Sequence, residues 1–182
     1  GTGYNCRQMA IKTTPDNGGG ITHGYDAIIY AAEHGAHVVN CSWGSPVRSF
    51  VGEDVINYAT INKGVAVVIA CGNSQKDEKY FPAAYDRAIS VAMTTFEDSI
   101  VIIPNATSGG STYNYTVAVS APGISYFSTF PNSSYSDVGG TSFSSPLVAG
   151  VVGLTLSHFP TYTPNQAAQR VRITSQNHYA AN

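Results

Sequence analysis

The first half of the chain alternates short apolar runs with longer amphipathic segments. Apolar residues three and four positions apart predict helices over residues 22–34 and 51–62. Short runs of mostly apolar, partly β-branched residues predict strands over residues 9–12, 37–41 and 65–70. Because strands alternate with helices of about 12 residues, this half predicts right-handed βαβ units and a parallel sheet.

The second half continues the same architecture. Strands are expected from residue 89 and over residues 100–103 and 116–120, and a strongly apolar helix over residues 142–157. The last helix begins with a capping box, in which Thr163 precedes a proline and a glutamine follows three residues later. The run over residues 65–70 lacks polar alternation, which is typical of a parallel strand buried on both faces. We therefore expect an α/β fold, a three-layer sandwich with a central, mostly parallel sheet.

Composition narrows the functional classes. The chain has 182 residues, of which 43 % are hydrophobic and 11 % charged, so we expect one ordered domain rather than a disordered chain. The net charge is -2 and no basic stripe is present, which argues against a nucleic-acid partner. The longest apolar runs are far shorter than the roughly 20 residues that cross a bilayer, so no membrane partner is expected. A Ser-, Thr-, Asn- and Tyr-rich sequence that is poor in Lys and Glu suits a secreted protein.

Cysteines and the start of the chain add little chemistry. The three cysteines match no metal spacing and leave one unpaired in any disulfide scheme. Cys41 and Cys71 each end a β-branched run, so we expect them to be small buried hydrophobic residues. The first residues do not form a signal peptide, and the start is interpreted as internal.

Two polar residues stand where an α/β sheet places its chemistry, at the carboxyl ends of strands. Asn73 follows the buried run over residues 65–70, and Ser142 follows two glycines and begins the apolar helix. The free N–H groups and the dipole of a helix N-terminus favour a developing anion beside Ser142. Local chemistry alone favours a plain helix cap for Ser142 and a turn asparagine for Asn73.

Five segments in order resemble the subtilisin-like serine peptidases, the subtilases. The sequence G-T-S-F-S-S-P-L-V-A-G over residues 140–150 resembles the family's nucleophile motif. Residues 38–44 (V-V-N-C-S-W-G) resemble its substrate-cleft strand, and residues 67–73 (V-V-I-A-C-G-N) its oxyanion segment. Residues 81–83 and 121–123 match two further landmarks. The resemblance implies a subtilisin-like fold in which residues 1–182 form a single partial catalytic domain without its N-terminal part.

The same resemblance implies roles for individual residues. Ser142 attacks the scissile carbonyl, and its backbone N–H with the side-chain amide of Asn73 holds the oxyanion. A polypeptide substrate then lies as an added strand between two edges of the cleft. The residues implied to contact it are Asn17, Gly18, Gly19, Ser42, Trp43, Gly44, Gly72, Tyr80 and Thr141. No acidic residue falls on the implied pocket walls, which predicts a preference for a neutral side chain; Trp43 and Tyr80 are equally read as packing aromatics.

The aspartate and the histidine of the family's catalytic triad are expected upstream of this sequence, since neither motif is present. Residues 34–38 (H-G-A-H-V) and Asp16 imitate them, but His34 ends a predicted helix whereas the family's histidine begins one. Neither is assigned to catalysis. His23, His158 and His178 have no acidic partner in the sequence pattern and are expected at the surface or in packing. The isolated chain is expected to be inactive, with an exposed sheet edge and poor solubility.

Two readings of function remain open. The first is a serine endopeptidase, for which a propeptide or the absent N-terminal part of the domain is a further partner. The alternative is a pseudopeptidase or peptide-binding module that keeps the cleft without the catalytic relay. Nucleotide binding at residues 18–20 fails, because the glycines lack a following Lys-Ser/Thr and miss the dinucleotide spacing. No cofactor or catalytic metal is required, while structural calcium is common in the family and carbonyls near Ala83 and Tyr85 are a candidate site.

Overall fold

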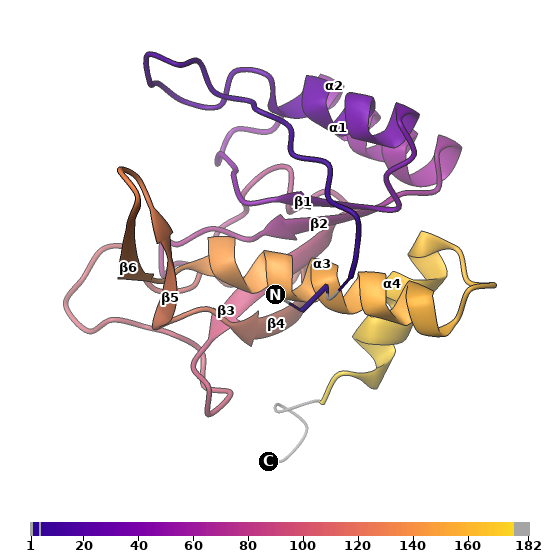
Figure 1. Ribbon diagram of the computed structural model, residues 1–182. Helices are drawn as coiled ribbons and strands as arrows, with labels where there is room; N and C mark the ends of the chain where they lie inside the picture. The colour runs from indigo at the N-terminus through magenta and orange to yellow at the C-terminus, as the bar shows by residue number, and fades with distance from the viewer. Residues whose placement is uncertain (1, 4, 177–182) are drawn as a thin grey trace.

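The computed structural model describes residues 2, 3 and 5–176, so His178 lies outside the described residues. Its helices and strands follow one another along the chain (Figure 1). In order they are α1 (Gly24–Glu33), β1 (Val38–Cys41), α2 (Phe50–Asn57), the π-helical turn η1 (Tyr58–Asn62), β2 (Ala66–Ala70), β3 (Ile89–Thr94), β4 (Val117–Pro122), β5 (Tyr126–Phe130), β6 (Ser134–Val138), α3 (Thr141–His158) and α4 (Pro164–Thr174).

A parallel sheet in the order β1-β2-β3-β4 forms the middle layer. Figure 1 shows α1 and α2 over one face of this sheet and α3 and α4 over the other, which confirms the predicted α/β sandwich. The buried strand β2 explains the arrangement, because all five of its residues are buried. Val67 and Ile69 pack in the cluster that includes α1 and α2, while Val68 packs with Val148 of α3. Apolar side chains on both sides of one strand thus hold a helix layer on each face.

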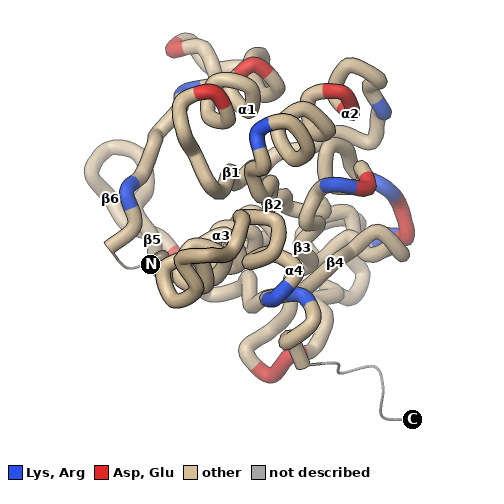
Figure 2. The backbone as a smooth tube through the Cα atoms, turned by 90° about the vertical axis from the view of Figure 1, so that its right-hand side faces the viewer, with Lys and Arg blue, Asp and Glu red and all other residues tan. Residues whose placement is uncertain are grey.

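The capped helices match their sequence signals. The side chain of Thr163 accepts a hydrogen bond from the backbone of Gln166 at the start of α4, and the reciprocal bond of the capping box is also present. The helix predicted over residues 51–62 is confirmed, but its last five residues form η1 rather than an α-helical turn. Helix α3 carries no charged Asp, Glu, Lys or Arg, and Figure 2 shows the charged residues scattered over other segments.

Two predicted strands are wrong. Residues 9–12 run without regular structure, and most of their side chains are exposed. Residues 100–103 form only an isolated bridge between Thr94 and Ile100, and Ile102 and Ile103 are exposed. An apolar run becomes a strand only where several successive residues pair with a neighbouring strand. Among the described residues, 9–12 form no such pairing, and 100–103 form a bridge to β3 at Ile100 alone. The hairpin β5–β6, by contrast, pairs antiparallel and leads directly into α3.

Strand β1 forms one edge of the described sheet, and the open edge expected from the lack of the domain's N-terminal part stays a prediction. The expected poor solubility stays a prediction. In the part of the chain that the structure describes, no helix is long and apolar enough to span a membrane.

The cysteines occupy the positions expected of small hydrophobic residues. Cys41 and Cys71 are buried and unpaired, whereas Cys6 is exposed. Burial raises the pKa of the Cys41 thiol to about 12 and that of Cys71 to about 11. Both thiols are therefore protonated at neutral pH, and neither offers a nucleophilic thiolate beside the oxyanion segment.

Candidate active site

Ser142 lies in the first turn of α3, where backbone N–H groups have no partner within the helix. Gly139 and Gly140 connect the hairpin β5–β6 to α3, and Gly140 is the N-cap residue of α3. The hydroxyl of Ser142 donates to the carbonyl oxygen of Ser42 at 3.4 Å, a long bond that links α3 to the segment after β1. A serine held at a helix N-terminus beside a strand end has the surroundings that favour an anion forming next to it.

Asn73 lies at the carboxyl end of β2, and its side chain is fixed by α3. Its Oδ1 accepts hydrogen bonds from the backbone N–H and the hydroxyl of Thr141, both at 2.9 Å. Because a backbone N–H can only donate, these bonds identify the carbonyl end of the Asn73 amide and leave the NH2 end for a ligand. The approach is close: a Cβ on Gly140 would lie 3.2 Å from Asn73 Nδ2.

A pocket of about 140 Å³ brings most of the predicted site residues together. Its lining consists of Ser42, Trp43, Gly44, Ala70, Gly72, Asn73, Tyr80, Thr141 and Ser142. Among these, Ala70 is the residue that the sequence reasoning missed. It carries no polar group, and the available signal was its place inside the oxyanion segment, as the last residue of the buried strand.

The side walls of the pocket are joined by a backbone bridge. Ser45 and Phe81 exchange two hydrogen bonds, at 2.9 and 2.8 Å, which brings Tyr80 beside Gly44. Trp43 lines the pocket and also packs edge-on against Tyr25 of α1, with ring centroids 5.4 Å apart. Trp43 therefore belongs both to the pocket and to the packing of the helix layer.

Three predicted contacts lie apart from this pocket. Asn17, Gly18 and Gly19 belong to an exposed loop whose ends are joined by hydrogen bonds to the carbonyl oxygen of Thr13. A Cβ on Gly18 or Gly19 would meet nothing within 4 Å. Their role as the opposite edge of a substrate cleft stays a prediction.

The residues that imitate a triad are engaged elsewhere. His34 caps the C-terminal end of α1, where its ring stacks on Tyr30 at 3.8 Å and its Nδ1 bonds the Tyr30 carbonyl oxygen at 2.8 Å. Asp16 forms an exposed ion pair with Lys12. Neither residue lines the pocket that contains Ser142.

The expectation that His23 has no acidic partner is wrong. His23 Nδ1 lies 3.0 Å from Asp26 Oδ2, because the two residues are three positions apart at the start of α1. Both side chains are largely exposed, and the spacing alone could have revealed the pair. His158, near the end of α3, packs its ring edge-on against Phe159.

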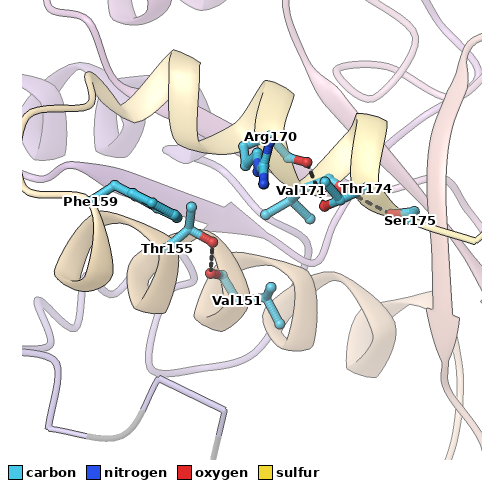
Figure 3. A pocket seen from close by; sticks show the side chains of 7 residues that line it. All are labelled: Val151, Thr155, Phe159, Arg170, Val171, Thr174 and Ser175. Atoms are coloured by element: carbon cyan, nitrogen blue, oxygen red, sulfur yellow. Dashed lines mark hydrogen bonds between the residues drawn. The ribbon is translucent and has the colours of Figure 1, made fainter.

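A larger hollow of about 440 Å³ lies between α3 and α4 (Figure 3). It is lined by Val151, Thr155, Phe159, Arg170, Val171, Thr174 and Ser175. The Thr155 hydroxyl donates to the Val151 carbonyl oxygen, and that of Thr174 to the Arg170 carbonyl oxygen. Each of these hydroxyls donates to a carbonyl oxygen of its own helix. The smaller pocket, by contrast, contains both the hydroxyl of Ser142 and the side-chain amide of Asn73.

Comparisons with known proteins agree with this arrangement. The profile of the Subtilase family matches residues 1–181. The chain is 36 % identical to thermitase of Thermoactinomyces vulgaris, in an alignment that covers 97 % of this chain and 59 % of thermitase. It is 34 % identical to subtilisin DY of Bacillus licheniformis, in an alignment that covers 97 % of this chain and 64 % of that protein. The crystal structure of a cold adapted subtilisin-like serine proteinase superimposes with a TM-score of 0.73 at 27 % identity, covering 87 % of this chain and 56 % of that one. The chain thus spans less than two thirds of each of these proteins.

Proposed function

The chain belongs to the subtilase family, a family of serine proteases, and on that premise we propose that it carries the nucleophile and the oxyanion hole of a serine endopeptidase. One observation carries the proposal. Ser142 and Asn73 line the same pocket, and Thr141 holds the carbonyl end of the Asn73 amide, so its NH2 end can donate to a ligand. A plain helix cap or turn asparagine requires no such pairing.

The proposed chemistry is acyl transfer. Ser142 Oγ attacks the scissile carbonyl carbon, and the carbonyl oxygen becomes an oxyanion that accepts hydrogen bonds from the Ser142 N–H and from Asn73 Nδ2. The positive end of the α3 dipole stabilises the same charge. The C–N bond then breaks, the amine leaves with a proton, and water hydrolyses the ester on Ser142.

A base must accept the proton of Ser142, because a serine hydroxyl is otherwise a weak nucleophile. Within the described residues the Ser142 hydroxyl bonds a backbone carbonyl oxygen, which cannot accept that proton as a base. Because this sequence lacks the motifs that carry the histidine and its orienting aspartate in the family, we propose that both lie outside it. The protein that joins them to this chain is called the longer protein below, and the chain by itself is expected to be inactive.

The proposed substrate is a polypeptide that adds as a strand beside residues 42–44, with the loop at residues 17–19 as the opposite edge. None of the described residues lining the pocket is charged. We expect it to take a neutral side chain on the acyl side of the cut bond, between Trp43 and Tyr80.

We further propose three features that the chemistry itself does not need: a structural calcium ion, a propeptide as partner, and secretion of the longer protein. Among the described residues, no group of three His, Cys, Asp or Glu side chains could hold a metal ion. The carbonyl oxygen of Tyr85 already accepts the Ala88 N–H, and a weak calcium site near Ala83 and Tyr85 stays a prediction. No step of the proposed chemistry passes through a metal.

The test is peptide hydrolysis by the longer protein. We expect cleavage of an uncharged chromogenic peptide, and its loss in Ser142→Ala with the melting temperature unchanged. Full activity in Ser142→Ala would overturn the proposal. Tight binding of the peptide without hydrolysis, in a longer protein that has other residues in place of the aspartate and histidine, would instead establish a peptide-binding module.

A further inference from the structure

Helix α3 contains a proline one turn after the proposed nucleophile. In an α-helix each N–H donates to the carbonyl oxygen four residues earlier, so the partner of Ser142 would be the N–H of residue 146. That residue is Pro146, which has no N–H. The carbonyl oxygen of Ser142 is therefore deprived of its helical hydrogen bond, at the residue whose position matters most for the proposed chemistry.

The side chain of Ser42 supplies the hydrogen bond that Pro146 cannot. Its Oγ donates to the Ser142 carbonyl oxygen at 2.9 Å. The contact crosses from the segment after β1 to the first turn of α3, between residues 100 positions apart. It replaces a bond within the helix by a bond between the helix and the strand end that borders the pocket.

The hydrogen bonds of Ser42 account for every donor and acceptor of its hydroxyl. A hydroxyl donates once and accepts twice. The single proton is directed to the Ser142 carbonyl oxygen, which can only accept. Asn40 Nδ2 donates to Ser42 Oγ at 3.1 Å, and the buried Ser145 hydroxyl, 3.3 Å away, must then be the second donor. These three partners together favour one orientation of the Ser42 hydroxyl, with its proton toward the Ser142 carbonyl oxygen.

Ser42 holds Ser142 at a second point. Its backbone carbonyl oxygen accepts the hydroxyl of Ser142 at 3.4 Å, so one residue contacts both the main chain and the side chain of the nucleophile. The long bond to the hydroxyl is the weaker of the two and is readily given up to a base. The bond to the Ser142 carbonyl oxygen has no such competitor in the reaction.

We propose that the Ser42 hydroxyl is a positioning residue for the reaction, which holds the first turn of α3 in place of the hydrogen bond that Pro146 removes. This inference rests on the proposed function. The Ser142 N–H and Oγ both belong to the residue that Ser42 anchors, so a tilt of this turn displaces the oxyanion donor and the nucleophile together. Small displacements of reacting groups are costly in rate.

A double-mutant cycle in the longer protein tests the proposal. Ser42→Ala is expected to lower kcat about tenfold, the equivalent of one hydrogen bond, with KM changed by less than about twofold. The substitution keeps the backbone of residues 42–44, where the peptide is proposed to pair. Adding Pro146→Ala supplies an N–H at position 146 that can bond the Ser142 carbonyl oxygen, and it is expected to restore most of the lost kcat.

A matched control separates positioning from stability. Ser49→Ala removes another serine hydroxyl, the N-cap of α2 that accepts from the Gly52 N–H at 3.1 Å. It is expected to lower the melting temperature but leave kcat unchanged. A Ser42→Ala protein that melts higher than Ser49→Ala and yet has the lower kcat would support the positioning role.

The outcomes distinguish this inference from the proposed function. Normal kcat in Ser42→Ala, together with an inactive Ser142→Ala, overturns the positioning role alone. A double variant no more active than Ser42→Ala also overturns it, because the missing bond to Ser142 would then not be the cause. Activity that survives Ser142→Ala overturns the proposed function itself.

Discussion

Asn73 connects the oxyanion hole to the fold, and its two ends can be perturbed separately. The Oδ1 of Asn73 accepts two hydrogen bonds from Thr141, which is fully buried. The NH2 end of Asn73 is the proposed donor to the oxyanion. Asn73→Ala removes both ends of the amide. Asn73→Asp keeps an oxygen for both bonds from Thr141 and replaces only the donor by a carboxylate oxygen.

The structure gives different magnitudes for the two variants. In Asn73→Ala, the N–H and the hydroxyl of Thr141 lose their acceptor, at about 1–3 kcal/mol for each buried group left unsatisfied. In Asn73→Asp both bonds remain, and a carboxylate near the N-terminus of α3 is electrostatically favourable, so the free energy of unfolding changes by less than about 1 kcal/mol. For catalysis, loss of one such donor in a subtilisin costs about 10²–10³ in kcat, a value taken from that enzyme rather than worked out for this chain.

The assay measures kcat for an uncharged peptide and the free energy of unfolding in urea, both on the longer protein. We expect both variants to lose activity to a similar degree, and only Asn73→Ala to lose several kcal/mol of stability. Asn73→Asp activity within about tenfold of the wild type would refute the role of the amide as oxyanion donor. Equal stability of wild type and Asn73→Ala would refute the account of the Thr141 contacts.

Three further predictions concern the scaffold. Gly72→Ala is expected to lower the free energy of unfolding in urea more than Gly35→Ala does. Both residues have positive φ, +109° and +84°, but only at Gly72 would a Cβ meet neighbouring atoms, the closest at 2.9 Å. Similar losses in the two variants would contradict this packing. Among the three cysteines of this chain, iodoacetamide is expected to label Cys6 alone in the native protein, as peptide mapping would check, because the other two thiols are buried with raised pKa. The carboxylate of Glu33 accepts a hydrogen bond from the Tyr58 hydroxyl and lies beside Lys63, and both contacts lower the pKa of Glu33 below its ordinary value. A lowered carboxyl pKa stabilises the fold at pH values above the pKa of the unfolded chain, and this effect is lost as pH falls through the pKa of the folded state. Glu33→Gln should therefore lower the melting temperature more at pH 7 than at pH 3, and an equal difference at both would contradict the interaction.

The sequence predicted the layers of this fold well because their signals are local. The uninterrupted apolar run of β2 required helices on both faces, and the capping box marked the start of α4. The run at residues 100–103 carried the same apolar signal and is not a strand, because pairing depends on which backbone lies beside it. Such a neighbour cannot be read from a short run of residues.

The site shows the same division between local and distant information. Motif order predicted that Ser142 and Asn73 would meet, and the pocket contains both. The hydrogen bond from Ser42 to the Ser142 carbonyl oxygen was not predicted, since it joins residues 100 positions apart. Pro146 was the available signal: a proline inside a helix leaves one carbonyl oxygen without a partner, and the sequence identifies that oxygen before the structure shows what bonds it.

The most direct test of the central claim is covalent labelling of the longer protein with a fluorophosphonate, followed by peptide mapping. The account predicts one label, on Ser142, that disappears in Ser142→Ala and slows about 10²-fold or more in Asn73→Asp. Labelling of the wild type at another residue, or none in a longer protein that carries the aspartate and histidine, would contradict the assignment of Ser142 as the nucleophile.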